Sequence, residues 1–140
     1  MSEELRSKAK QTTVFLADGR PEVRSALRLV LEQEPAWKVV GEADSAEGLL
    51  DRMQVSDPDM LLLDWELPES DRCCPSKRLG ERLVPTLLSH DPSLLIVAMS
   101  SRPENDRVSL DAGAHGFVCK CGPPELLLRM LRSVLSGGRR

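Results

Sequence analysis

Five short apolar runs, separated by segments with helical periodicity, constrain the fold of this chain more than any other feature. Regular alternation of strand-like and helix-like segments is typical of a parallel sheet covered by crossover helices. The second run is the most polar, as suits an edge strand, whereas the third and fourth indicate strands buried on both faces. The sequence therefore predicts an α/β domain with five parallel strands. The runs are Thr13–Ala17, Val39–Ala43, Met60–Leu63, Leu94–Met99 and Gly116–Cys119.

The segments between these runs carry the signals of five helices. Pro21 suits the first turn of the first helix, and Asp44 with Glu47 resembles a capping pair that opens the second. Pro75 and Pro85 interrupt the third, and a proline inside a helix costs about 3 kcal/mol, so we expect a kinked or two-piece helix there. The last two helices are expected over Pro103–Ala112 and from Pro123-Pro124 to Gly137-Gly138.

Length, charge and hydropathy narrow the class of protein. A chain of 140 residues is in the usual size range of one domain, and its formal charge of −3 predicts no nucleic-acid binding by this chain. No apolar run approaches the roughly 20 residues of a membrane helix, and the polar N-terminus lacks the apolar middle of a signal peptide. We expect a cytoplasmic protein with an N-terminal tail (1–11), one domain (12–136) and a C-terminal tail or start of a linker (137–140).

The four cysteines occur as Cys73-Cys74 and Cys119-Lys120-Cys121. These spacings match neither a zinc site nor a thioredoxin-type redox pair. His90 and His115 could complete a metal site with them, but nothing in the spacing favours it. We expect reduced thiols that bind no metal.

Polar residues end four of the five predicted strands. Asp18 follows the first, Asp64 the third, Ser100-Ser101 the fourth and Lys120 the fifth. Because ligands of such sheets bind beyond the carboxyl ends of the strands, we expect these side chains to meet at one edge. An acid at one strand end is often only a turn former, but capping does not explain all four together.

The same residues resemble the receiver domain of bacterial response regulators, in the style of the LuxR/NarL-type transcription regulators. The resemblance covers nearly the whole chain through FLADGRPEVRSAL, PDMLLLDWELP, IVAMSS and GAHGFVCKCGPPELLLRML. It implies a doubly wound, CheY-like three-layer sandwich with strand order 2-1-3-4-5.

The resemblance also implies a role for each residue at the sheet edge. Asp64 would accept a phosphoryl group, and oxygen ligands would hold Mg²⁺ beside it. A hydroxyl and an ammonium would bind the phosphoryl oxygens, and a buried aromatic would take part in the switch. The implied metal ligands are Asp18, Asp64 and the Glu66 backbone carbonyl, and the implied phosphate-binding and switch residues are Ser100, Ser101, Lys120 and Phe117.

The chemistry justifies these residue types independently of the family. A carboxylate attacks a phosphoryl group only where the negative charge of both is offset, which a hard divalent cation does. Lys120 supplies a point charge to the phosphoryl oxygens, and the hydroxyl of Ser100 can donate to them. We also expect Lys120 within ion-pair reach of Asp64 when no metal is bound.

Gly19 departs from the pattern that the resemblance implies, because the family usually has a second, metal-binding acid there. Its absence removes an anionic oxygen, so we expect a weakened magnesium site. Two hypotheses follow: a working receiver with a relaxed metal site, or a degenerate receiver that binds partners without phosphorylation. Glu66 and Arg102 would flank the site, either meeting as opposite charges over it or remaining separately solvated.

Partners and activity follow from the resemblance. It implies a sensor histidine kinase or phosphotransfer protein as the phosphodonor, and a homodimer through the fourth helix, fifth strand and fifth helix is one option. An enzyme on the same fold is disfavoured, because the turn ADGRPE is not a nucleotide-binding glycine loop and no G-x-S-x-G occurs. We expect no catalysis beyond self-phosphorylation and autodephosphorylation, and no contact with nucleic acid or membrane.

Overall fold

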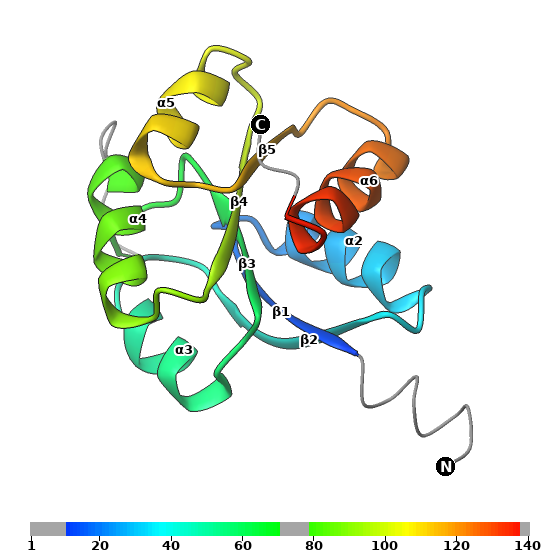
Figure 1. Cartoon of the computed structure of the whole chain (residues 1–140), viewed down its shortest axis with the longest axis horizontal. Coiled ribbons are helices and arrows are strands. Elements are labelled where there is room, and N and C mark those ends of the chain that lie inside the picture. Colours follow the sequence, from blue (N-terminus) through cyan, green and yellow to red (C-terminus); the bar gives the residue numbers. More distant parts are fainter. Residues whose placement is uncertain (1–10, 71–78, 138–140) are drawn as a thin grey trace.

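The computed structural model describes residues 11–70 and 79–137, which contain a five-stranded parallel sheet (Figure 1). The strand order is β2-β1-β3-β4-β5, and every neighbouring pair is parallel. The predicted α/β class and strand order are therefore confirmed. The strands are β1 (Thr12–Ala17), β2 (Trp37–Ala43), β3 (Met60–Asp64), β4 (Leu95–Ser100) and β5 (Gly116–Cys119).

Helices cover both faces of the sheet and make it the middle of three layers. Helices α2 and α6 lie on one face, and α3, α4 and α5 lie on the other (Figure 1). The chain reaches both faces because each parallel connection must cross over the sheet. The helices are α2 (Pro21–Glu32), α3 (Leu49–Ser56), α4 (Leu79–His90), α5 (Asn105–Ala112) and α6 (Pro124–Leu135).

The core consists of two clusters, one on each face of the sheet. Alternate residues of a strand point to opposite faces, so Phe15 packs in the cluster on the α3–α5 side while Val14 and Leu16 pack on the other. Every residue of β3 is buried, as predicted for a strand covered on both faces. Because β3 is the middle strand of the sheet, Asp64 at its end is also buried.

One helix prediction is wrong. Asp44 and Glu47 do not cap α3, which begins only at Leu49 after Gly48 in the left-handed region (φ 73°). The Glu47 amide instead donates to the Glu69 carbonyl, because the loop after β3 lies beside this turn. The expected third helix lies partly outside the described residues; its described part, α4, runs from Leu79 to His90 with Pro85 inside it.

Cys73, Cys74 and Pro75 lie outside the described residues, so the predictions that concern them are not tested there. Within residues 11–70 and 79–137, no three His, Cys, Asp or Glu side chains form a group that could hold a metal ion. The Nδ1 atom of His115 accepts a hydrogen bond from the Ile96 amide (3.0 Å) and so serves the structure of β4.

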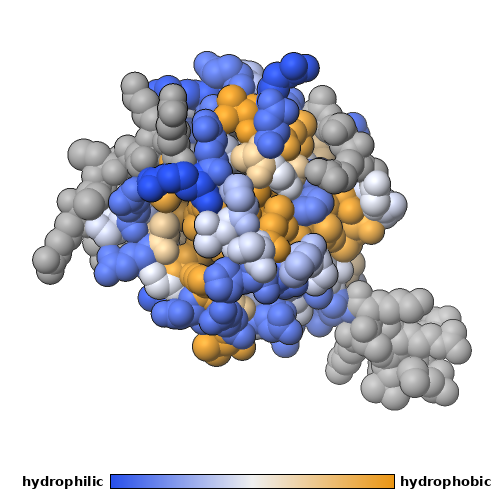
Figure 2. Space-filling model, turned by 60° about the vertical axis from the view of Figure 1, so that its left-hand side comes forward, coloured by the Kyte–Doolittle hydropathy of each residue, from blue (hydrophilic) through white to orange (hydrophobic). Residues whose placement is uncertain are grey.

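Among the residues that the structure describes, four large apolar side chains are exposed. Figure 2 brings the α3–α5 side forward and shows apolar surface there in patches between polar side chains. Val55 of α3 is exposed on its own, whereas Leu29 of α2 and Leu126 and Leu135 of α6 share the opposite layer. None of the described helices is long and apolar enough to cross a membrane.

Candidate functional site

The carboxyl ends of β1, β3 and β5 bring two acids and one base together. The Lys120 ammonium lies 2.9 Å from Asp18 Oδ2 and 2.8 Å from Asp64 Oδ1. The side chains of Asp18 and Asp64 are 0% and 6% exposed and that of Lys120 is 13% exposed, so solvent screens these ion pairs little. The predicted ion pair between Lys120 and Asp64 is confirmed.

Local backbone geometry fixes Asp18. The chain leaves β1 and turns directly into α2, which begins at Pro21, and Asp18 Oδ1 accepts a hydrogen bond from the Arg20 amide (2.9 Å) across this turn. Arg24, one turn into the helix, donates through Nη1 to the Asp18 carbonyl (2.7 Å). The Arg20 amide thus holds the Asp18 carboxylate, and Arg24 holds the backbone of the same residue.

Asp64 is held in the same way by the loop that follows β3. Its Oδ1 atom accepts a hydrogen bond from the Glu66 amide (3.0 Å). Burial raises the pKa of the Asp64 carboxyl above its ordinary value; Asp18 adds to the rise, and the Lys120 ammonium and the Glu66 amide oppose it. A buried carboxylate whose charge is only partly offset is the kind of group that functional sites contain.

Ser100, which is fully buried, ends β4 beside these charges. Its Oγ atom accepts hydrogen bonds from the Arg102 amide and from Asn105 Nδ2, each at 3.0 Å. It donates to Glu66 Oε1 at 3.2 Å. Ser100 therefore joins the loop after β3 to the first residue of α5.

The remaining predicted residues take different positions. Phe117 of β5 is buried in the core cluster on the α3–α5 side, whereas Ser101 and Arg102 are exposed. No ion pair between Glu66 and Arg102 occurs in the part of the chain that the structure describes. Of the two alternatives left open for this pair, the described residues do not show a meeting of opposite charges; Glu66 Oε1 accepts the Ser100 hydroxyl instead.

Comparison with known proteins identifies the family. Residues 14–132 match the model of the response regulator receiver domain. The chain belongs to this receiver family.

Relatives and solved structures agree with this assignment. The receiver is 28% identical over 131 residues to the nitrate/nitrite response regulator protein NarL of Escherichia coli, covering 94% of this chain and 58% of that protein. It is 32% identical to the transcriptional activator protein ExaE of Pseudomonas putida, covering 89% and 55%. The isolated REC domain of RcsB from Salmonella enterica serovar Typhimurium superimposes with a TM-score of 0.78 at 26% identity, covering 93% of this chain and 92% of that one. The receiver spans a little over half the length of these curated relatives.

Receiver domains use Mg²⁺ at this edge of the sheet, and the residues here fit such an ion with fewer ligands. Asp18 Oδ2 and Glu66 Oε2 are buried and accept no hydrogen bond, and Asp18 Oδ2 faces only the Lys120 ammonium in the described residues. Carboxylate and carbonyl oxygens are the donors that Mg²⁺ prefers. Gly19 contributes no side-chain oxygen, so two carboxylates are available where the family usually has three.

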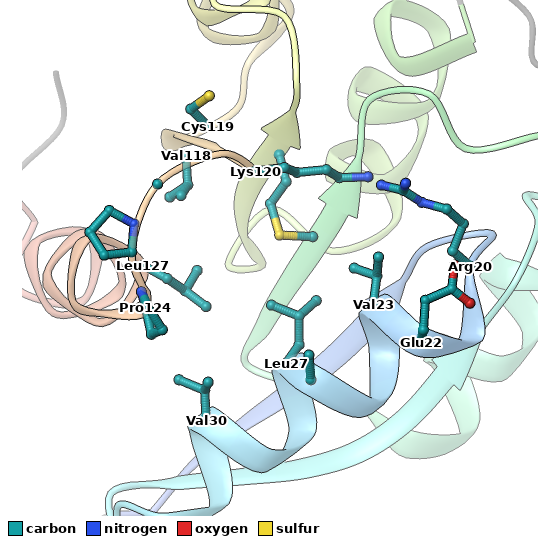
Figure 3. A pocket seen from close by; sticks show the side chains of 14 residues that line it. Arg20, Glu22, Val23, Leu27, Val30, Val118, Cys119, Lys120, Pro124 and Leu127 are labelled. Carbon is teal, nitrogen blue, oxygen red and sulfur yellow. The ribbon is translucent and has the colours of Figure 1, made fainter.

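An apolar groove adjoins the site between α2 and α6. Its volume is about 300 Å³, and Val23 and Leu27 of α2 face Leu127 of α6 across it (Figure 3). Lys120 and Arg20 line the end of the groove nearest the carboxylates, and Figure 3 shows their side chains pointing toward one another. Glu22 lines the same end, so the groove meets the site at a rim of mixed charge.

Two contributors to the site were missed by sequence reasoning, the side chains of Arg24 and Asn105. The Glu66 side chain was expected to flank the site, but its hydrogen bond with Ser100 was not predicted. Asn105 lies five residues after Ser100, inside the helix expected over Pro103–Ala112, and nothing in the sequence pointed to Ser100 as its partner. Contacts of this kind depend on how loops fold over the sheet edge, which no spacing in the chain encodes.

Proposed function

We propose that this chain is a working receiver in which Asp64 accepts a phosphoryl group from a sensor histidine kinase or phosphotransfer protein. The observation that carries the proposal is the Lys120 ammonium 2.8 Å from Asp64 Oδ1, beside a second carboxylate and a buried serine hydroxyl. Phosphorylation would then alter how the receiver binds its partner or effector. Like other receivers, it signals through association and is not an enzyme acting on an external substrate.

The reaction follows from the positions of these groups. An oxygen of the Asp64 carboxylate attacks phosphorus, the bond from phosphorus to the donor nitrogen breaks, and the donor imidazole leaves as an acyl phosphate forms. Lys120 stays beside the new phosphoryl oxygens and offsets their charge. Ser100 can donate its hydroxyl proton to one of them once its present hydrogen bond is released.

Asp18, Asp64 and the Glu66 backbone carbonyl would hold Mg²⁺. The bound cation would offset the negative charge of the carboxylate and of the phosphoryl group. With Gly19 in place of an acid, we propose that this site binds Mg²⁺ weakly, and Lys120 between the two carboxylates competes for the same oxygens.

The groove between α2 and α6 supports a docking role in this transfer. It opens beside Asp64, and Lys120 belongs to both the groove and the site. We propose that the phosphodonor protein packs an apolar surface here while its phosphohistidine reaches Asp64. Self-association through α5, β5 and α6 is a separate proposal for the phosphorylated form.

A second candidate function rests on Gly19. Lys120 pairs with Asp64 at 2.8 Å and with Asp18 at 2.9 Å, so part of the charge of the two carboxylates is already offset without metal or phosphate. A degenerate receiver that binds its partner in this state, without phosphorylation, is the alternative.

Modification by a small phosphodonor separates the two functions. We expect acetyl phosphate with millimolar Mg²⁺ to add one phosphoryl group to the native chain, measured by intact mass and located at Asp64 by peptide mapping. Asp64→Asn should abolish the gain, because it removes the nucleophile. Asp111→Asn, an exposed position on α5, serves as the matched control and should leave the gain unchanged.

Absence of any mass gain in the native chain across magnesium concentrations would contradict phosphorylation and favour the alternative. The phosphoryl mimic beryllofluoride is a second probe of the same site, and the related RcsB domain was solved in its presence. Trp65, which directly follows Asp64, reports binding by fluorescence.

A further inference from the structure

The carboxylate of Glu66 lies against the hydroxyl of Ser100, although neither family motif nor metal binding requires it there. Glu66 Oε1 accepts the serine hydroxyl at 3.2 Å. Glu66 Oε2 is buried and has no hydrogen-bond partner in the described residues. An anionic group from the loop after β3 is therefore held in the site at the cost of one unsatisfied oxygen.

The hydrogen-bonding capacity of Ser100 is fully used. A serine hydroxyl has one proton to donate and two lone pairs that accept. The Arg102 amide and Asn105 Nδ2 occupy the lone pairs, and the proton goes to Glu66. A phosphoryl group on Asp64 could therefore receive the Ser100 proton only by displacing Glu66.

We propose that Glu66 is a positioning residue that withholds the Ser100 hydroxyl from the phosphoryl group by acting as its internal competitor. This inference rests on the proposed function, because it concerns the same site after phosphorylation. The Glu66 carboxylate and the phosphoryl group both offer anionic oxygens, and the Ser100 hydroxyl can donate its hydrogen bond to only one of them at a time.

The competition extends to helix α5. Asn105 is the first residue of α5, and its side-chain amide donates to Ser100 Oγ. The same Oγ atom donates its proton to Glu66. When Ser100 turns its hydroxyl from Glu66 to a phosphoryl oxygen, the geometry of the hydrogen bond that it accepts from Asn105 changes with it. We therefore expect the N-terminus of α5 to respond to the release of Glu66.

Removal of the competitor should strengthen binding of a phosphoryl mimic. We expect Glu66→Gln to lower the beryllofluoride concentration at half-saturation by about fivefold or more, since a hydrogen bond to a charged acceptor is stronger than one to an amide. Glu66→Ala, which leaves no acceptor, should lower it at least as much. The readout is Trp65 fluorescence with Mg²⁺ saturating for each protein.

A second background separates competition for the hydroxyl from simple charge repulsion. In Ser100→Ala there is no proton to withhold, so adding Glu66→Gln should change the half-saturation concentration by less than about twofold. Glu69→Gln is the matched control on the same loop, because Glu69 is exposed and pairs with Arg82 (2.8 Å). It should have no effect in either background.

Each outcome bears on the proposal. A gain from Glu66→Gln that disappears in Ser100→Ala supports it. Two results overturn it while leaving the proposed function intact. One is an equal gain from Glu66→Gln in both backgrounds, and the other is no gain from Glu66→Gln when the native Ser100 is present. A native chain that stays unmodified by phosphodonor while Glu66→Gln is modified supports competition and defeats the proposed function for the native sequence. No response from any protein defeats both.

Discussion

At the scale of single residues, Gly19 decides how the site handles a cation. A Cβ atom at this position would lie 3.1 Å from Pro68 Cδ and 3.4 Å from Pro68 Cγ. The sequence suggested that an acid here would cost only backbone freedom, but the structure adds a packing cost at the proline ring. The backbone of Gly19 is outside the left-handed region, so the ring is the obstacle that an added side chain meets.

Gly19→Asp should therefore strengthen magnesium binding only to the extent that Pro68 yields. We expect the Mg²⁺ concentration at half-saturation, measured by Trp65 fluorescence, to fall by about tenfold, the equivalent of about 1.4 kcal/mol. Gly19→Asn has the same size without the charge and should give much less of this gain. If Gly19→Asp binds Mg²⁺ no better, even together with Pro68→Ala, the missing carboxylate is not what limits the site.

At the scale of secondary-structure elements, α4 supports the loop that carries the site through one close contact. Trp65 is 5% exposed, and its indole packs directly on the backbone of Gly80 in the first turn of α4. A Cβ atom at Gly80 would lie 2.8 Å from Cδ2, Cε3 and Cζ3 of the ring. The glycine thus allows the helix and the indole to approach at van der Waals distance.

Gly80→Ala should destabilise the fold although alanine is the better helix former. The helix-propensity gain is about 1 kcal/mol, whereas overpacking costs about 1–3 kcal/mol, so we expect a net loss of up to about 2 kcal/mol. Urea unfolding followed by Trp65 fluorescence measures it. Thr86→Ala, at an exposed position of the same helix, should not destabilise the fold. Equal stability of the two variants would show that the indole moves aside easily.

At the scale of the whole molecule, the site lowers the stability of the fold that carries it. The folded pKa of Asp64 is raised above its ordinary value of 3.8, mainly because the carboxyl is buried. Between the unfolded and folded pKa values the folded state binds more protons than the unfolded chain, so stability falls as pH rises through this interval. Above it, the full cost of the buried charge is present.

Asp64→Asn should remove that cost. We expect the variant to be more stable than the native chain at pH 7, by about 1 kcal/mol or a few degrees in Tm, and the difference to vanish below pH 3.8. Thermal unfolding at a series of pH values measures both. Asp111→Asn, with its exposed carboxyl, should show no such difference. A less stable Asp64→Asn at pH 7 would mean that the pairing with Lys120 outweighs burial.

The α/β fold and the residues that end the strands could be predicted from the sequence alone. Apolar runs such as Met60–Leu63 require burial on both faces, and parallel strands then carry their carboxyl ends to one edge, so the approach of Asp18, Asp64 and Lys120 follows from topology alone. Local signals were less reliable. The capping pattern of Asp44 and Glu47 does not form a cap, and the Glu47 amide instead donates to the Glu69 carbonyl in the loop after β3.

The contacts of each polar side chain depend on tertiary packing and could not be predicted from the sequence. Glu66 binds Ser100 rather than Arg102, and Gly19 lies against a proline ring, because loops that are distant in the sequence pack over the same edge. A side chain of several rotatable bonds reaches many partners from one backbone position, and the choice among them depends on burial and on the donors that other loops supply. The sequence therefore places the charges of the site, and the packing of its loops decides how they are paired.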